Sequence, residues 1–143
     1  MASLVRIGGQ SDILGESSIW HQKEQALYWV DIRRPVIRRF DHASGSVASW
    51  PMPDLVGSIA FCADGRPLVA LPDKLAFFDR ASGTLAPFAS LPQTVPGHRC
   101  NDGRCDNQGR FWVGAPRRWR ASRRRGRCLP SRLAPAVAWS RSS

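Results

Sequence analysis

The chain lacks the long apolar runs and the cysteine pairs that define several protein classes. No apolar segment among its 143 residues approaches the roughly 20 residues needed to span a bilayer, which excludes a membrane-spanning helix. The N-terminus has no sustained apolar core, so we expect no signal peptide and a cytoplasmic protein. The four cysteines, Cys62, Cys100, Cys105 and Cys128, form no Cys-x-x-Cys pair, and we expect reduced thiols rather than a zinc site.

Acidic residues are absent from the last fifth of the chain. Residues 115–143 hold nine Arg and no Lys, Asp or Glu, whereas residues 1–114 hold 12 Lys and Arg against 11 Asp and Glu. The formal net charge of +10 therefore belongs almost entirely to this tail. Such a segment cannot bury enough apolar surface to fold alone, and we predict a disordered basic tail over residues 115–143.

Three interpretations of the tail compete. An Arg-rich arm could bind nucleic-acid phosphates, or it could be a solvated run of like charges without a partner. A change of reading frame near Ala115 would also give Arg-, Ala-, Pro- and Ser-rich sequence in a GC-rich gene. We favour the third, because the change is abrupt and interrupts a strand pattern; we do not expect a nucleic-acid partner.

The first 114 residues repeat at an interval of about 40 residues. Tyr28, Leu68 and Phe111 stand at equivalent places in three strand cores, 40 and 43 residues apart. The sequence Phe-Asp-x-Ala-Ser-Gly occurs twice, starting at Phe40 and at Phe78. This interval is typical of the four-stranded blade of a β-propeller.

Short β-branched and aromatic segments, separated by Gly, Pro and Asp, predict an all-β fold without a long amphipathic helix. In the repeated Asp-x-x-Ser-Gly turns, we expect Asp and Ser to bond nearby backbone amides and Gly to supply a positive φ. The predicted strands cover residues 27–31, 36–40, 47–50, 58–61, 67–71, 75–78, 84–88 and 110–114.

A closed propeller ring has four to eight blades. At about 40 residues per blade, residues 1–114 supply between two and three. We therefore predict a partial propeller followed by an irregular Arg-rich tail. Its open blade edges would permit self-association.

Four motifs occur in order along the chain: LGESSIW at 14–20, LYWVDI at 27–32, RCNDGR at 99–104 and GRFWVG at 109–114. Together they resemble the SMP-30/gluconolactonase/LRE-like family, the regucalcin-like sugar lactonases. The resemblance covers about residues 10–114. It implies part of a six-bladed propeller that binds one divalent cation near its axis. Calcium is the first choice, with zinc, manganese or magnesium as alternatives, and the activity implied is hydrolysis of a sugar lactone to an aldonic acid.

The resemblance also assigns roles to individual residues. Glu16 corresponds to a metal ligand, and Arg99 and Asn101 correspond to substrate-binding residues. Asp102 corresponds to a buried turn residue beside the site. Carboxylate oxygens suit a hard cation, and an Arg fork with an amide suits an oxygen-rich ligand. Two simpler interpretations stay open: Glu16 as an N-terminal surface acid, and Arg99 with Asn101 as braces of a β-turn.

The family's catalytic Asp and its later metal ligands lie beyond the resemblance, so we expect no catalytic residue in this chain. The predicted function is that of a truncated, metal-dependent sugar-lactone hydrolase that is inactive as it stands. A sugar lactone is the expected partner, and no membrane partner is expected. The alternative is a β scaffold whose basic arm binds nucleic acid or an acidic partner.

Overall fold

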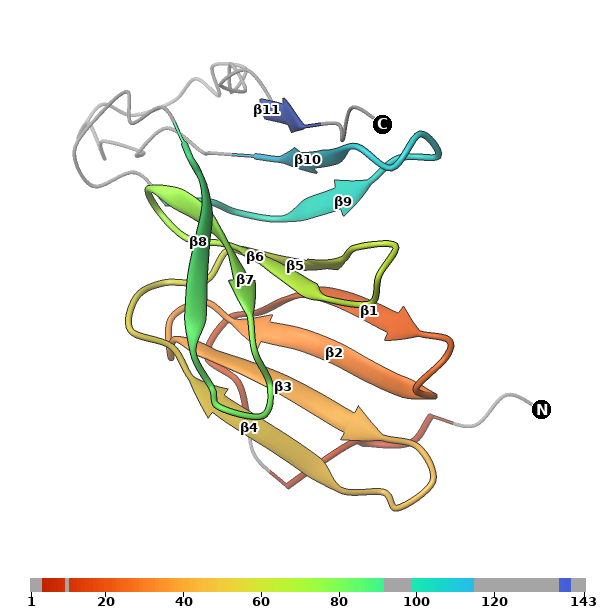
Figure 1. Ribbon diagram of the computed structural model, residues 1–143. Coiled ribbons are helices and arrows are strands. Elements are labelled where there is room, and N and C mark those ends of the chain that lie inside the picture. Colours follow the sequence, from red (N-terminus) through yellow and green to blue (C-terminus); the bar gives the residue numbers. More distant parts are fainter. Residues whose placement is uncertain (1–3, 10, 92–98, 115–136, 140–143) are drawn as a thin grey trace, which may run out of the picture.

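The described residues form three antiparallel β-sheets that follow one another along the chain (Figure 1). The computed structural model describes residues 4–9, 11–91, 99–114 and 137–139. Apart from residues 137–139, the predicted basic tail therefore lies outside the described residues. Within the described part, no helical segment has the length and apolar character needed to traverse a bilayer.

Each sheet is built from strands that are consecutive or nearly so in the sequence. The first sheet has the order β1 (Gly15–His21), β2 (Ala26–Asp31), β3 (Val36–Asp41) and β4 (Val47–Pro51). The second has the order β5 (Ser58–Phe61), β6 (Pro67–Ala70), β7 (Lys74–Phe78) and β8 (Leu85–Ser90). In the third, β10 (Phe111–Val113) lies between β11 (Val137–Trp139) and β9 (Gly103–Cys105).

The all-β prediction is confirmed, and every predicted strand has a counterpart in β2 to β8 or β10. Three short or irregular strands, β1, β9 and β11, were not predicted. The presence of β11 also departs from the expectation of a tail without regular structure. Its backbone pairs with β10, which would otherwise present unpaired amide and carbonyl groups along that edge.

The repeated Asp-x-x-Ser-Gly segments form matching turns, as predicted. Asp41 accepts hydrogen bonds from the backbone amide and hydroxyl of Ser44, and Asp79 accepts one from the hydroxyl of Ser82. The glycines that follow, Gly45 and Gly83, have φ values of 69° and 72°. This is the left-handed region, in which a residue without Cβ is favoured.

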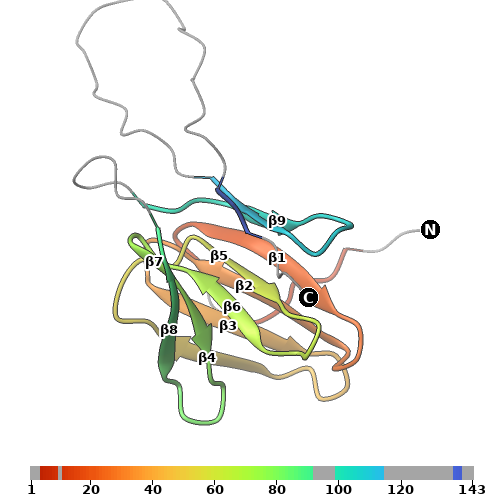
Figure 2. The same cartoon turned by 45° about the horizontal axis from the view of Figure 1, so that its top comes forward.

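The strands β5 and β6 of the second sheet are buried on both faces (Figures 1 and 2), whereas its outer strand β8 has no buried residue. Val69 of β6 faces a core shared with the first sheet, whereas its neighbours Leu68 and Ala70 face a core shared with the third. Successive side chains of a strand point to opposite faces, so two-sided burial requires a continuous apolar run. The strand Pro67–Ala70 is accordingly buried at all four positions.

Close backbone packing joins the second and third sheets. A Cβ added at Gly57, just before β5, would lie 2.4 Å from the carbonyl oxygen of Cys100. This separation is far below van der Waals contact, and the obstructing atom belongs to the backbone. The seam between the two sheets therefore requires glycine at position 57.

We expect Gly57→Ala to lower the free energy of unfolding by about 1–3 kcal/mol, because backbone must move to admit the methyl group. Urea unfolding followed by tryptophan fluorescence measures the change. Gly9→Ala is the matched control, since no atom lies within 4 Å of a Cβ added there. Equal losses in the two variants would contradict the assigned packing role.

Candidate functional site

Glu16 lies beside an irregular position in β1. The register of β1 against β2 shifts between Glu16 and Ile19, and Ser17 has a φ of 55°. The hydroxyl of Ser17 accepts a hydrogen bond of 3.2 Å from the backbone amide of Ile59 in β5. Bulges bend a strand and redirect its side chains, so this irregularity sets where Glu16 points.

A buried carboxylate fixes the chain just before Glu16. Asp31 has no exposed surface, and it accepts hydrogen bonds of 2.9 and 3.0 Å from the backbone amides of Ile13 and Leu14. A third amide, that of Arg34, donates to the same carboxylate at 3.1 Å. Burial acts to raise the pKa of Asp31, but the backbone donors outweigh it and lower the pKa. Asp31 therefore remains ionised and positions the Leu-Gly-Glu motif.

Arg99 and Asn101 contact each other. Nη1 of Arg99 donates to Oδ1 of Asn101 at 2.8 Å and to the carbonyl oxygen of Cys100 at 3.1 Å. The backbone amide of Asn101 donates to the carbonyl oxygen of Gly114 at 2.8 Å. These bonds brace the turn before β9, as the simpler interpretation expects. A guanidinium has five N–H donors, so Arg99 retains capacity for a ligand.

Glu16 lines a cavity of about 500 Å³ between the first and third sheets. Asp102 and Arg104 line it from the other side, whereas Arg99 and Asn101 are not among its lining residues. The structure therefore places Glu16 beside the Arg-x-Asn-Asp segment. Glu16 shares its cavity with Asp102 of that segment, and not with Arg99 and Asn101, the two residues that the resemblance implies. Asp102 was expected to be buried, and this is wrong: it is exposed, because the turn before β9 directs it toward the cavity.

Two charged groups in this cavity have no partner within the described ranges. No hydrogen bond or ion pair joins Glu16 or Arg104 to another described residue, or to each other. A third charged group, Asp12, is fully used, since it accepts 2.7 Å bonds from Nε1 of Trp29 and Nε of Arg38. The fourth, Asp102, accepts one bond from the backbone amide of Gly103 through Oδ1. Among the described residues, the cavity thus offers the Glu16 carboxylate and the Arg104 guanidinium without a partner.

Sequence reasoning did not identify Arg104 as a site residue. It is the last residue of the RCNDGR motif, but no role was assigned to it, and it lies in a strand that was itself not predicted. Across the parts of the chain that the structure covers, no group of three or more His, Cys, Asp or Glu could hold a metal ion. Glu16 can therefore serve as one ligand of a cation, but the described residues do not complete a coordination shell.

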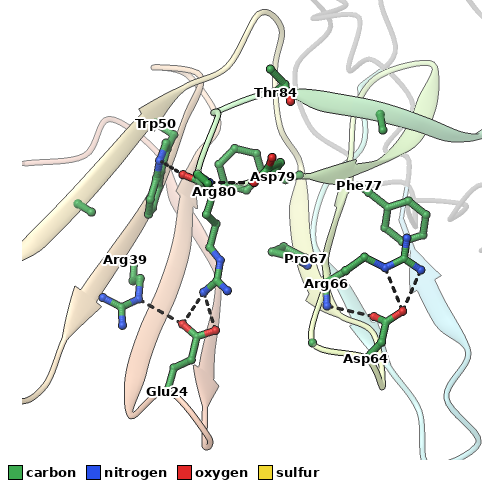
Figure 3. A pocket seen from close by; sticks show the side chains of 15 residues that line it. Glu24, Arg39, Trp50, Asp64, Arg66, Pro67, Phe77, Asp79, Arg80 and Thr84 are labelled. Carbon is green, nitrogen blue, oxygen red and sulfur yellow. Dashed lines mark hydrogen bonds and ion pairs between the residues drawn. The ribbon is translucent and has the colours of Figure 1, made fainter.

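A larger groove of about 1010 Å³ runs between the first and second sheets (Figure 3). Its charged side chains are already paired. Asp64 binds Arg66 on one wall, with the Arg66 guanidinium 4.0 Å from the centre of the Phe77 ring, and Glu24 binds Arg80 on the other. Because these groups satisfy one another, this groove is a weaker candidate for a ligand site.

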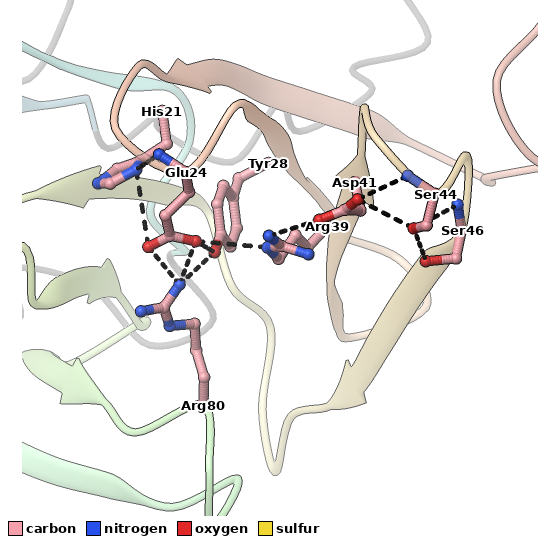
Figure 4. A network of polar contacts seen from close by, with 8 residues as sticks. All are labelled: His21, Glu24, Tyr28, Arg39, Asp41, Ser44, Ser46 and Arg80. Carbon is pink, nitrogen blue, oxygen red and sulfur yellow. Dashed lines mark hydrogen bonds and ion pairs between the residues drawn. The ribbon is translucent and has the colours of Figure 1, made fainter.

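Glu24 is the centre of the paired network on that wall (Figure 4). Its carboxylate accepts hydrogen bonds from Arg80 of the second sheet and from Arg39 and Tyr28 of the first. Burial acts to raise its pKa, but the bonds from Arg80 and Tyr28 prevail and lower it from 4.5 to about 2. The network therefore joins two sheets through one ionised carboxylate.

The SMP-30/Gluconolactonase/LRE-like region matches residues 14–134, and the chain belongs to this family. The match continues past Gly114, where the motif resemblance ended. The 6-deoxy-6-sulfogluconolactonase of Pseudomonas putida is 38% identical over 106 residues, which are 73% of this chain and 36% of that protein. The L-arabinolactonase of Azospirillum brasilense is 38% identical over 102 residues, 71% of this chain and 34% of that protein.

A solved structure has the same arrangement of strands. The calcium-binding protein regucalcin from Agrobacterium tumefaciens superposes with a TM-score of 0.70 at 29% identity, covering 75% of this chain and 36% of that one. The chain thus spans about a third of the length of the curated relatives it matches. These similarities establish the family and show that the all-β fold is like part of the regucalcin structure.

We expect acid to weaken the fold through Glu24. Its pKa is lower in the folded state, so its contribution to stability is present above pH 4.5 and is lost as the pH falls toward 2. Unfolding midpoints in urea between pH 6 and 2 measure this loss, and Glu24→Gln should show a shallower decline than the unchanged chain.

The matched control is Glu16→Gln, the same substitution at a carboxylate without a hydrogen-bond partner among the described residues. Glu16→Gln should keep the steep decline of the unchanged chain. Parallel pH profiles for the unchanged chain and Glu24→Gln would contradict the role given to Glu24.

Proposed function

We propose that this chain contributes the first part of the metal- and lactone-binding site of a sugar-lactone hydrolase. Glu16 is the metal ligand, and Arg99 and Asn101 bind substrate oxygens. The observation that carries the proposal is the free Glu16 carboxylate in a cavity shared with Asp102 of the Arg-x-Asn-Asp motif. Family membership supplies the reaction class.

The three sheets are proposed to be the first blades of a six-bladed propeller. The interval of about 40 residues and the four-stranded order of the first two sheets support this assignment. The first strands of successive sheets lie side by side, with β5 contacting both β1 and β9. In a ring, such strands surround the axis, and Glu16 and Asp102 would then face the central channel.

A hard divalent cation suits the oxygen donor that Glu16 provides. Calcium takes six to eight oxygen ligands, and a carboxylate that no described cation binds is a suitable one. The regucalcin that superposes on this chain is described as calcium-binding, which supports calcium as the first choice. When bound, the cation would polarise the lactone carbonyl. The chain's own residues would hold the cation through Glu16 and orient the lactone through Arg99 and Asn101.

The proposed substrate is an aldonolactone. The relatives named above act on a sulfogluconolactone and on an arabinolactone, both cyclic esters rich in hydroxyl groups. Arg and Asn side chains provide several N–H donors and one amide acceptor for such oxygens. One ligand and these contacts do not make a catalyst, so we further propose that the 143-residue chain alone does not hydrolyse lactone.

We expect the 143-residue chain to bind calcium weakly, with a dissociation constant on the order of 0.1–1 mM, because few oxygens are supplied. Glu16→Gln should weaken binding at least about 10-fold, the usual cost of removing a charged ligand interaction. Isothermal titration calorimetry measures both values. Asp54→Asn is the control, since Asp54 is an exposed acid remote from the cavity lining.

Gluconolactone hydrolysis is assayed beside the titrations, with calcium, manganese or zinc present. The rate should equal that of buffer. Unchanged calcium affinity in Glu16→Gln would refute the ligand assignment. Turnover above the buffer rate that Glu16→Gln abolishes would show that the chain holds a complete site.

A further inference from the structure

Arg104 is an exposed cation that forms no ion pair with any described residue, and it lines the cavity that also contains Glu16. It lies in the middle of β9, opposite Trp112 of β10. Asp106, an acid on this hairpin, is committed elsewhere: it accepts bonds of 2.6 Å from Nε of Arg110 and 2.8 Å from Nε1 of Trp112. Arg104 lines the cavity with N–H donors that no described residue accepts.

The acids that line the same cavity do not neutralise Arg104. Asp12 is held by Arg38 and Trp29, and one oxygen of Asp102 accepts a 2.9 Å bond from the backbone amide of Gly103. Glu16 forms no ion pair with Arg104, although both line the cavity. A guanidinium left free opposite a free carboxylate is suited to a ligand that has an anionic end and can reach both.

We propose that Arg104 binds the carboxylate that forms when the lactone opens; this rests on the proposed function. In that reaction a water oxygen bonds to the carbonyl carbon, and the bond from that carbon to the ring oxygen breaks. One proton of the water goes to the ring oxygen, which becomes a hydroxyl group, and the other is released. A neutral lactone thus becomes an aldonate anion.

A group that binds an anion more tightly than a neutral ligand stabilises both the transition state and the product of this reaction. Negative charge develops on the carbonyl oxygen as water adds, and a guanidinium aimed at it stabilises the transition state more than the neutral lactone. The same preference retains the aldonate after ring opening. Arg104 thereby selects ligands by charge, whereas Arg99 and Asn101 contact oxygens of the neutral sugar.

The test compares gluconate with sorbitol, a neutral polyol of the same chain length, on the 143-residue protein. Calorimetry and tryptophan fluorescence report binding, since Trp29 lines the cavity. We expect gluconate to bind more tightly than sorbitol. Arg104→Gln should weaken gluconate about 10- to 100-fold, the range for a hydrogen bond to a charged group, and leave sorbitol unchanged.

Arg104→Lys should recover part of the gluconate affinity, because it restores the charge without the planar fork. Arg66→Gln is the matched control; Arg66 is an exposed arginine in the turn between β5 and β6 that already pairs with Asp64. Urea unfolding of each variant shows that Arg104→Gln remains folded.

Equal affinities for gluconate and sorbitol, or equal gluconate affinities in Arg104→Gln and the unchanged chain, would overturn the inference. Absence of saturable gluconate binding at millimolar concentration would overturn it as well. Calcium titration separates it from the proposed metal site. Arg104→Gln should retain calcium affinity. If gluconate binding depends on Arg104 but calcium binding does not depend on Glu16, only the metal assignment is refuted.

Discussion

Burial of β5 and β6 of the second sheet on both faces is the constraint on which the rest of the structure depends. A sheet whose strands are apolar on both sides is stable only when another layer covers each face. The first sheet covers the Val69 face and the third covers the Leu68 face. This sandwiching places the residues of β1 and β9, which lie far apart in the sequence, on either side of β5.

The strand β5 contacts both β1 and β9, the two strands that carry residues of the candidate site. Ser17 is bonded to the amide of Ile59, and the carbonyl of Cys100 lies against Gly57. These contacts fix the positions of Glu16 and of the Arg-x-Asn-Asp segment relative to the same strand. The cavity that contains Glu16 and Arg104 is therefore a consequence of sheet packing.

The regular part of the fold could be predicted from the sequence because its signals are local. The alternation of buried and half-buried residues in β2, and the Asp and Gly of the repeated turns, depend on neighbours a few residues away. The strands that carry the site gave no such signal. β1 is interrupted at Ser17, and β9 is a Gly-Arg-Cys segment whose glycine packs against the hydroxyl of Ser58 in another sheet.

The site, like the fold, could be predicted from the sequence only where its signals are local. Glu16 was found through a motif, and the structure places it in a polar cavity. Arg99 and Asn101 were found in the same way, but their mutual hydrogen bond depends on the turn geometry. Arg104 could not be singled out, because its significance depends on its sharing a cavity with Glu16 without an ion pair to any described residue, which no sequence pattern reports.

Two polar clusters of this protein differ in how completely their charges are satisfied. Around Glu24 each charged group is paired with a group of opposite charge. The cluster therefore holds two sheets together, and its charges are not available to a ligand. Around Glu16 and Arg104 the charges face the same cavity unbonded. Arg104 is exposed and Glu16 is half-buried, so water solvates both charges when no ligand is present. Charged side chains left unbonded by the described residues between the first and third sheets stay available to a ligand, unlike the paired charges around Glu24.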